Sequence, residues 1–320
     1  MGGEASMLAN LNDVLLPAKK GKYAVGLFNA VDIELARGVL AAAESTQSPV
    51  IMGTAEILFP YGPLDEVSYY LIPMAKKASV PIVVHLDHGL NKETCLKAMD
   101  LGFTSIMYDC STYPYEENIK RVKEMADIAH ERGVTIEGEL GHVGNNGDGT
   151  DPKLFYTQPE KAKDFVDRTG VDALAIAVGN AHGAYKLPPK LDFERIHTIA
   201  NTVDVPLVLH GGSGLTDYDF KRAIQEGISK VNIFTDINVA AVEAEFRRFN
   251  SMDKGIIDLI PAAVEAVKQE TSKKMELFGS CGHASDGRGA AFRHEDQGKS
   301  AEIEKITRAV LEAMKNYSGK

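Results

Sequence analysis

Short runs of apolar residues recur along the first 235 residues of the chain, and most of them are nearly continuous in apolar character. There are eight such runs: YAVGLF (23–28), PVIMGT (49–54), PIVVHLDH (81–88), TSIMYD (104–109), TIEGEL (135–140), ALAIAV (173–178), PLVLHG (206–211) and KVNIFT (230–235). Runs of this kind are typical of parallel strands that are covered on both faces, because neither face meets water. The pattern therefore predicts eight buried parallel strands.

Segments with helical periodicity fill the intervals between these runs. Two examples are DIELARGVLAAAEST (32–46) and YEENIKRVKEMADIAHERG (115–133), and helical segments end at Gly102 and Gly133, since glycine is favoured just beyond a helix. Eight strand and helix repeats at a spacing of about thirty residues are the number and length expected for a (β/α)8 TIM barrel. We therefore predict an α/β protein of this fold.

A doubly wound open sheet is the alternative for alternating strands and helices. It would usually have fewer strands and a glycine-rich nucleotide-binding motif after the first strand, and LFNAVD (27–32) is not such a motif. We expect one barrel domain over residues 1–320, with strands at roughly 23–235 and additional C-terminal helices and a loop over 236–320. The segment 279–298, rich in Gly, His and Arg, is predicted to be that loop.

Composition and charge limit the possible partners. The net charge is −10 and no dense basic patch is visible, which argues against nucleic acid and against an anionic membrane surface as partners. No run of 18 apolar residues occurs, so no membrane span is expected. Three cysteines, Cys95, Cys110 and Cys281, lack metal-type spacing. They fit a reducing compartment, and we predict a cytoplasmic protein.

Polar and titratable residues gather where the predicted strands end, whereas no such cluster occurs where the strands begin. They are Asp87, His88, Asp109, Glu137, Glu139, His182, His210, Asn232 and Thr235. In a (β/α)8 barrel the carboxyl ends of all strands face one rim, and active sites are built there. We therefore expect the functional site at this rim.

Three histidines from different strand ends, His88, His182 and His210, predict a metal site. A single histidine at a strand end is more often a hydrogen-bonded core residue, but three with carboxylates between them can supply three nitrogen ligands to Zn²⁺ and leave a fourth position open. By strand alternation His85 lies opposite His88, so we expect it to support the site rather than to bind the metal.

An anion-binding loop is predicted after the seventh strand, where the sequence reads HGGSG (210–214). Successive glycines let backbone N–H groups converge on an anion, and barrels often bind phosphate after strands seven and eight. Lys186 can add a positive charge. The predicted strands contain one lysine, Lys230, and it begins the eighth strand at the end away from the site. A Schiff-base lysine is therefore not expected, and a metal is favoured.

Six motifs in this order give the chain a family resemblance: HLDHG (85–89), IMYDCS (106–111), EGELG (137–141), GNAHGAY (179–185), LHGGSG (209–214) and VNIFTDI (231–237). With them the chain resembles the class II, metal-dependent ketose-bisphosphate aldolases of the fructose and tagatose type, from about residue 7 to about residue 283. The (β/α)8 fold of that family agrees with the strand count.

The resemblance implies a role for each matching residue. His88, His182 and His210 match the ligands of the catalytic Zn²⁺, and Asp87 matches the residue that handles the proton of the C4 hydroxyl. Asp109 and Glu139 match carboxylates that hold a second metal position in some members. The positions that match the binding site of the dihydroxyacetone-phosphate half are Gly183, Lys186, Gly211, Gly212, Ser213, Asn232 and Thr235. A monovalent cation, Na⁺ or K⁺, is also expected there.

The implied reaction is the zinc-dependent, reversible cleavage of a ketose 1,6-bisphosphate, of fructose or tagatose type, to dihydroxyacetone phosphate and an aldehyde. Breaking the C3–C4 bond leaves negative charge on the C2 oxygen, which a Lewis acid stabilises. The resemblance also implies a place in sugar metabolism such as glycolysis, and a homodimer or homotetramer.

The chain departs from the family pattern in two places. The loop GHVGNNGDGTD (141–151) lacks the glutamate that protonates the intermediate in relatives, and Asp148 or water could replace it. The region NSMDKGIIDLIPAA (250–263) lacks the arginine that binds the second phosphate in relatives. Four arginines could replace it: Arg247, Arg248, Arg288 and Arg293. Otherwise the substrate is a ketose 1-phosphate without the second phosphate.

Two other functions are compatible with parts of the pattern. A metal-dependent sugar-phosphate hydrolase would usually have a His-x-His pair on its first strand, and LFNAVD (27–32) lacks it. A non-catalytic relative that only binds sugar phosphates would not need Asp87 together with all three histidines. The sequence therefore favours the aldolase.

Overall fold

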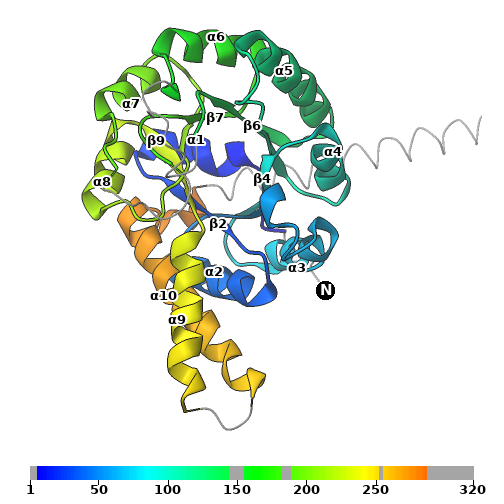
Figure 1. Ribbon diagram of the computed structural model, residues 1–320, viewed down its shortest axis with the longest axis vertical. Helices are drawn as coiled ribbons and strands as arrows, with labels where there is room; N and C mark the ends of the chain where they lie inside the picture. Colours follow the sequence, from blue (N-terminus) through cyan, green and yellow to red (C-terminus); the bar gives the residue numbers. More distant parts are fainter. Residues whose placement is uncertain (1–5, 144–154, 182–188, 252–254, 287–320) are drawn as a thin grey trace, which may run out of the picture.

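The computed structural model describes residues 6–143, 155–181, 189–251 and 255–286, and these residues form a closed parallel barrel (Figure 1). Its strands are β1 (Leu8–Ala9), β2 (Val25–Asn29), β3 (Val50–Ala55), β4 (Ile82–Gly89), β5 (Ser105–Tyr108), β6 (Thr135–Leu140), β7 (Ala173–Ile176), β8 (Leu207–Leu209) and β9 (Ile228–Ile233). Strands β2 to β9 follow one another around the barrel, and β9 pairs with β2 to close it. The predicted (β/α)8 fold is confirmed.

Strand β1 is an addition that the apolar pattern did not indicate. It pairs with the beginning of β4, where Leu8 lies beside Ile82. The short neighbour β5 begins only at the level of His85, with Ser105 as the partner residue. The first residues of β4 therefore have an unpaired edge on that side, and β1 provides the missing hydrogen bonds.

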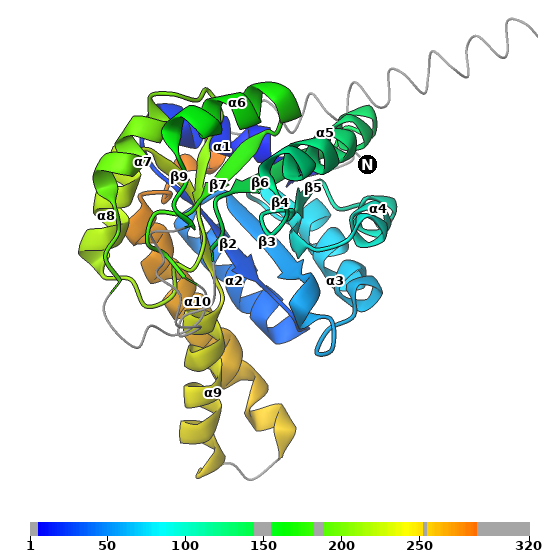
Figure 2. The ribbon, with the colours of Figure 1, turned by 45° about the horizontal axis from the view of Figure 1, so that its top comes forward.

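Helices cover the outer wall and the amino end of the barrel, and one hairpin of helices extends away from it (Figure 2). They are α1 (Leu11–Gly21), α2 (Ile33–Thr46), α3 (Leu64–Lys77), α4 (Lys92–Asp100), α5 (Tyr115–Glu131), α6 (Pro159–Thr169), α7 (Phe193–Ala200), α8 (Asp217–Glu226), α9 (Thr235–Phe249) and α10 (Ile260–Phe278). Short 3-10 turns are η1 (Glu56–Leu58), η3 (Ile256–Asp258) and η4 (His283–Ser285). Most buried apolar side chains form one core between the helices and the barrel wall.

Helix α1 closes the amino end of the barrel and so decides which end stays open. It begins at a capping box, in which Asn10 accepts from the Asp13 backbone and the Asp13 side chain accepts in return. Its buried residues, Leu11 and Leu15 among them, join a second apolar cluster with side chains from the barrel interior such as Leu27. The interior is thus apolar at the amino end, and its polar side chains lie towards the carboxyl end.

Helices α9 and α10 form a hairpin that projects from the barrel (Figure 1). The prediction of C-terminal helices is confirmed for α9 and α10, and α10 packs against α2. Of the predicted loop 279–298, residues 279–286 are described and contain η4, and the remainder lies outside the described residues. Within the described residues, no helix combines the length and apolar character needed to cross a bilayer.

Candidate active site

The open rim of the barrel brings together most of the residues predicted for the site. Asp87, His88 and His210 offer ligand atoms within 4.8 Å of one another, and so do His88, Asp109 and Glu139. These side chains come from the ends of β4, β5, β6 and β8, which are far apart in the sequence. The predicted residues His182, Gly183 and Lys186 lie outside the described residues.

A bulge in β4 allows Asp87 and His88 to reach the same site. The register with β5 shifts between Leu86 and Gly89, and His88 has a φ of 43°, in the left-handed region. Strict alternation would turn neighbouring side chains to opposite faces, and the bulge removes that constraint. His85 is fully buried, its Nδ1 lies 2.7 Å from the Ser105 Oγ, and it belongs to neither candidate group.

Of the three predicted histidine ligands, His88 and His210 are described, and their rings face each other so that a cation can lie between them. The His88 Nε2 and the His210 Nδ1 are 2.8 Å apart. The opposite nitrogens meet carboxylates, His88 Nδ1 at Asp109 and His210 Nε2 at Glu137, each at 2.8 Å. Since a carboxylate accepts, each ring carries its hydrogen there and presents a lone pair at the facing nitrogen. A proton or a metal ion can bridge two such lone pairs, so these residues fit a metal.

The electrostatics of the pair agree with this arrangement. Burial opposes a charge on His88, but the charge of Asp87 and the hydrogen bond to Asp109 outweigh it and raise the pKa of His88 to about 10. Burial and the charge of His88 lower the pKa of His210. In the protein alone His88 therefore carries the bridging proton, which a divalent ion can replace.

Asp109 and Glu139 form the second candidate group with His88. Burial and then the charge of Asp109 raise the pKa of Glu139 to about 8. Glu139 accepts a hydrogen bond of 3.0 Å from the Val143 backbone. Two carboxylates this close, with Glu139 buried and Asp109 partly buried, repel each other as anions, and a second cation would relieve that repulsion. The geometry thus fits the predicted second metal position.

Asp87 lies beside the histidines and is held by two amides. Asn29 Nδ2 donates to one carboxylate oxygen at 2.8 Å, and Asn232 Nδ2 donates to the other at 3.0 Å. Burial would raise the pKa of Asp87, but the charges of His88 and His210 hold it well below its usual range. Asp87 is therefore an oriented carboxylate that is ionised at neutral pH.

Lys230 lies deeper in the site than the sequence indicated, and the prediction that it sits at the distant end was wrong. Strand β9 begins at Ile228, so Lys230 is an interior residue of the strand. Its Nζ lies 2.8 Å from the Glu137 Oε2 and 2.9 Å from the Asn232 Oδ1. Burial opposes the charge of Glu137, but the charge of Lys230 outweighs it and lowers the pKa of Glu137 to about 2.

The predicted phosphate loop lies across the barrel mouth from β4. Gly211 has a φ of 63°, and a Cβ there would lie 2.0 Å from the Ala181 carbonyl oxygen. Ser213 Oγ accepts hydrogen bonds of 3.4 Å from the backbone of Phe234 and Asp236 at the start of α9. The glycine therefore permits a close approach of backbone that no other residue would allow.

A cavity of about 370 Å³ joins these parts into one site. Its lining includes Asp87, His88, Asp109, Gly211, Gly212, Ser213, Asn232 and Thr235. Asn29 and His142 also line it, and the sequence analysis assigned neither of them a role. Asn29 is the last residue of β2, so its position at a strand end could have predicted its place in the site. His142 is positioned by the loop after β6, which the strand pattern does not predict.

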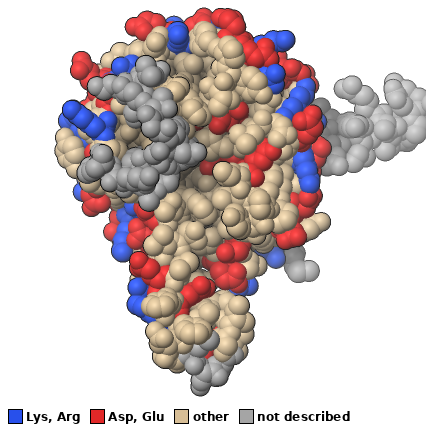
Figure 3. Space-filling model, viewed as in Figure 1, with Lys and Arg blue, Asp and Glu red and all other residues tan. Residues whose placement is uncertain are grey.

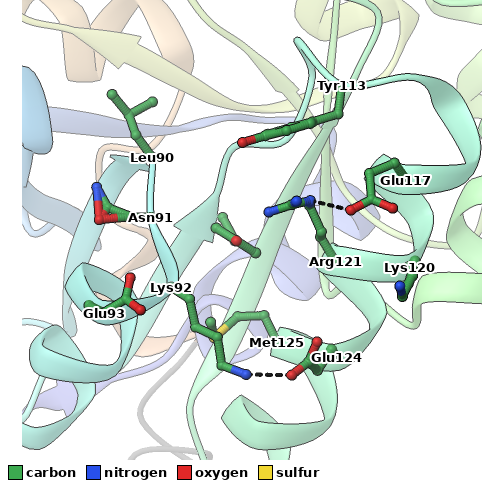
Figure 4. Close-up of a pocket in the computed structure, with 11 residues that line it drawn as sticks. Leu90, Asn91, Lys92, Glu93, Tyr113, Glu117, Lys120, Arg121, Glu124 and Met125 are labelled. Carbon is green, nitrogen blue, oxygen red and sulfur yellow. Dashed lines mark hydrogen bonds and ion pairs between the residues drawn. The ribbon is translucent and has the colours of Figure 1, made fainter.

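A second cavity, of about 420 Å³, lies outside the barrel between α4 and α5 (Figure 4). Lys92 pairs with Glu124 across it, and Arg121 pairs with Glu117 at 2.6 Å. None of the predicted site residues lines this cavity. Two of the basic groups that line it, Lys92 and Arg121, are therefore already neutralised by acidic partners.

The fold and the cavity define a (β/α)8 barrel enzyme with a candidate metal centre beside an oriented carboxylate. Residues 9–283 match the family model described as fructose-bisphosphate aldolase class-II. The chain belongs to the class II fructose-bisphosphate aldolase family, as the motifs predicted. It is an aldolase, a carbon–carbon lyase, of a metal-dependent family in which the metal is typically zinc.

Similar proteins differ in the substrates that their names give. The chain is 39% identical over 285 residues to fructose-bisphosphate aldolase of Geobacillus stearothermophilus (87% of this chain, 99% of that protein). It is 40% identical over 277 residues to 6-phospho-5-dehydro-2-deoxy-D-gluconate aldolase of Shouchella clausii (85% and 94%). The crystal structure of the YdjI aldolase from Escherichia coli K12 matches with a TM-score of 0.79 and 38% identity (87% and 99%). The reaction class is shared among them, and the substrate is not.

Proposed function

We propose that this aldolase cleaves a ketose 1,6-bisphosphate, of the fructose or tagatose type, reversibly to dihydroxyacetone phosphate and an aldehyde, with zinc as the metal. One observation carries the proposal. The oriented carboxylate Asp87 lies beside the facing nitrogens of His88 and His210, in a cavity that also includes the loop Gly211–Ser213. This is a base, a metal centre and an anion site within reach of one small molecule.

The proposed zinc ligands are His88 and His210, with His182 from outside the described residues as the third. When bound, zinc supplies Lewis-acid stabilisation of the charge that develops on the substrate's carbonyl oxygen. Asp109 and Glu139 are proposed to hold the second metal position. Asp109 also fixes the ring of His88 through its 2.8 Å contact with Nδ1.

The proposed base is Asp87. In cleavage its carboxylate takes the proton of the C4 hydroxyl, the C4–O bond becomes the aldehyde carbonyl, and the electrons of the C3–C4 bond move towards the C2 oxygen. In condensation the same proton returns to the C4 oxygen. Asn29 and Asn232 orient the carboxylate through their amide groups. The proposed donor of the proton to C3 is Asp148 or water, and Asp148 lies outside the described residues.

The proposed phosphate site is formed by Gly211, Gly212, Ser213 and Thr235. Thr235 begins α9, and the positive end of the helix dipole favours an anion there. Asn232, Gly183 and Lys186 complete the proposed set, the last two from outside the described residues. A monovalent cation, Na⁺ or K⁺, is proposed to accompany the phosphate.

A ketose 1-phosphate is the second candidate substrate, and one observation favours it. Ile57, Leu58, Leu90 and Val143 line the cavity on the sides away from the phosphate loop. Among the described residues of the lining there is no lysine or arginine. A second phosphate would meet an apolar wall there unless a residue outside the described ranges, such as Arg288 or Arg293, reached it.

A substrate panel tests the proposal and separates the candidates. We expect fructose or tagatose 1,6-bisphosphate to release dihydroxyacetone phosphate with a kcat/KM well above that of the matching ketose 1-phosphate, measured by coupled NADH oxidation. A higher kcat/KM with the 1-phosphate would favour the second candidate. Release of inorganic phosphate without dihydroxyacetone phosphate would contradict both and indicate a sugar-phosphate hydrolase.

We also propose that the protein is a homodimer or homotetramer, with the α9–α10 hairpin in the interface. Val239, Val242, Phe246 and Phe249 form one exposed stripe along α9, and Phe246 is 71% exposed. Ile256 and Ile257 extend this stripe at the tip, where the surface is largely uncharged (Figure 3). A contiguous apolar surface of this kind is typical of an interface, and a second copy offers the same surface in return.

We also propose a cytoplasmic location. The free cysteines Cys95 and Cys110, both buried, support it, because such thiols persist in a reducing compartment.

Phe246→Glu tests the proposed interface. We expect this change to convert the oligomer to smaller species, because it places a charge in the centre of the apolar stripe, and sedimentation velocity would measure the change in mass. Tyr69→Glu is the matched control, since Tyr69 on α3 is 76% exposed and lies outside the stripe. A monomeric wild type, or an oligomer unaffected by Phe246→Glu, would argue against the interface.

A further inference from the structure

A buried ion pair connects the proposed metal ligand His210 with the carboxylate Asp87. Lys230 and Glu137 are both 0% exposed, and the Lys230 Nζ lies 2.8 Å from the Glu137 Oε2. We propose that this pair is a positioning unit that fixes the metal ligand His210 and the base Asp87 relative to each other. The inference rests on the roles proposed above for these two residues.

One arm of the unit runs from Lys230 to the base. Lys230 donates to the Asn232 Oδ1 at 2.9 Å, and Asn232 Nδ2 donates to the Asp87 Oδ1 at 3.0 Å. An ammonium group can only donate, so it turns the amide oxygen of Asn232 towards itself and the amide NH2 towards Asp87. Without the ammonium the amide could rotate and place its oxygen against the carboxylate, which would repel it.

The other arm runs from Glu137 to the metal ligand. The Glu137 Oε1 accepts from His210 Nε2 at 2.8 Å, and its second oxygen receives the ammonium of Lys230. Glu137 therefore fixes the ring of His210 and keeps its hydrogen on Nε2, so that Nδ1 presents a lone pair towards His88. Glu137 and Lys230 thus hold His210 and Asp87, respectively, and a single contact joins the two arms.

Neither member of the pair takes a direct part in the reaction. The described contacts of the Lys230 ammonium and of the Glu137 carboxylate are with other protein side chains, so both act through those side chains. Burying two charges costs several kcal/mol per ion, and apolar residues of similar volume often replace such a pair without loss of stability. Stability alone is therefore a poor reason for this pair, whereas the orientation of two functional side chains is a sufficient one.

The test compares the double variant Lys230→Met/Glu137→Gln with the wild type. The double change removes both charges together, so neither is left buried and unpaired. We expect zinc affinity, measured by competition with a chromogenic chelator, to fall about 10- to 100-fold, as for other residues that support a metal ligand. We expect kcat to fall by a similar factor with little change in KM, because substrate-contacting residues are retained.

Val267→Ala is the control for a general loss of stability, since Val267 is fully buried in α10 and remote from the site. It should lower the thermal unfolding temperature and leave zinc affinity and kcat per folded molecule unchanged. Unchanged zinc affinity and kcat in the double variant would overturn the inference and leave the proposed function intact. A wild type that neither binds zinc nor cleaves a ketose phosphate would overturn both.

Discussion

Asp87→Ala is expected to lower the turnover of ketose phosphate cleavage by about 10²- to 10⁴-fold, the usual contribution of a general acid or base, and to leave zinc bound. The reason is geometric, because the carboxylate is the group that Asn29 and Asn232 orient towards the cavity. The rings of His88 and His210 keep their own carboxylate contacts, with Asp109 and Glu137, in this variant. Initial rates at saturating substrate measure the turnover, and zinc content by elemental analysis measures the metal.

The pH profile of the wild type adds an independent readout. The pKa of Asp87 lies below its usual range, because the charges of His88 and His210 outweigh the effect of burial. Asp87 is therefore already ionised at pH values where aspartate ordinarily starts to protonate, and its protonation should not limit kcat between pH 5 and 8. Asp65→Ala, at a partly exposed position on α3, is the control and should keep full turnover. A normal rate in Asp87→Ala would reject the assignment of the base.

His210→Ala is expected to abolish tight zinc binding and, with it, cleavage. The change removes one of the two facing nitrogens and also leaves Glu137 without its 2.8 Å contact to the ring. Zinc content after dialysis against a weak chelator is the measurement. His197→Ala removes an exposed histidine of α7 and should keep the full zinc content.

Removal and return of the metal complete this test in the wild type. Chelator-treated enzyme should lose cleavage and regain it with Zn²⁺ or Co²⁺. Borohydride with substrate should leave activity intact, because the metal mechanism forms no lysine adduct. Irreversible inactivation by borohydride, or zinc binding that survives His210→Ala, would contradict the proposed metal centre.

Sequence pattern alone predicted the fold and where on it the site would lie. Apolar runs and glycine stops are local signals, so eight strands and the helices between them could be recognised without the structure. In a parallel barrel all strand ends meet at one rim, and this rule placed Asp87, His88, Asp109, Glu139 and His210 together before any distance was known. The match to the family model over residues 9–283 confirms the resemblance that these motifs carried.

The additions at the amino end were not predictable in the same way. Strand β1 is two residues long and exists because β5 is too short to pair with the first residues of β4. Helix α1 precedes the first long apolar run, and its local sequence does not indicate that it covers the amino end of the barrel. Both depend on what the rest of the chain leaves uncovered.

The sequence by itself determined which side chains stand at the strand ends, because strand order and chain direction fix them. Tertiary structure decided which of those side chains face one another. The bulge at His88, with φ of 43°, turned two neighbours in β4 into the same cavity, against the alternation of an ideal strand. The depth of Lys230 likewise follows from where β9 begins and from the carboxylate of Glu137 across the barrel. Both features are set by contacts between strands that are distant in the sequence. A local pattern of residues carries no information about such contacts.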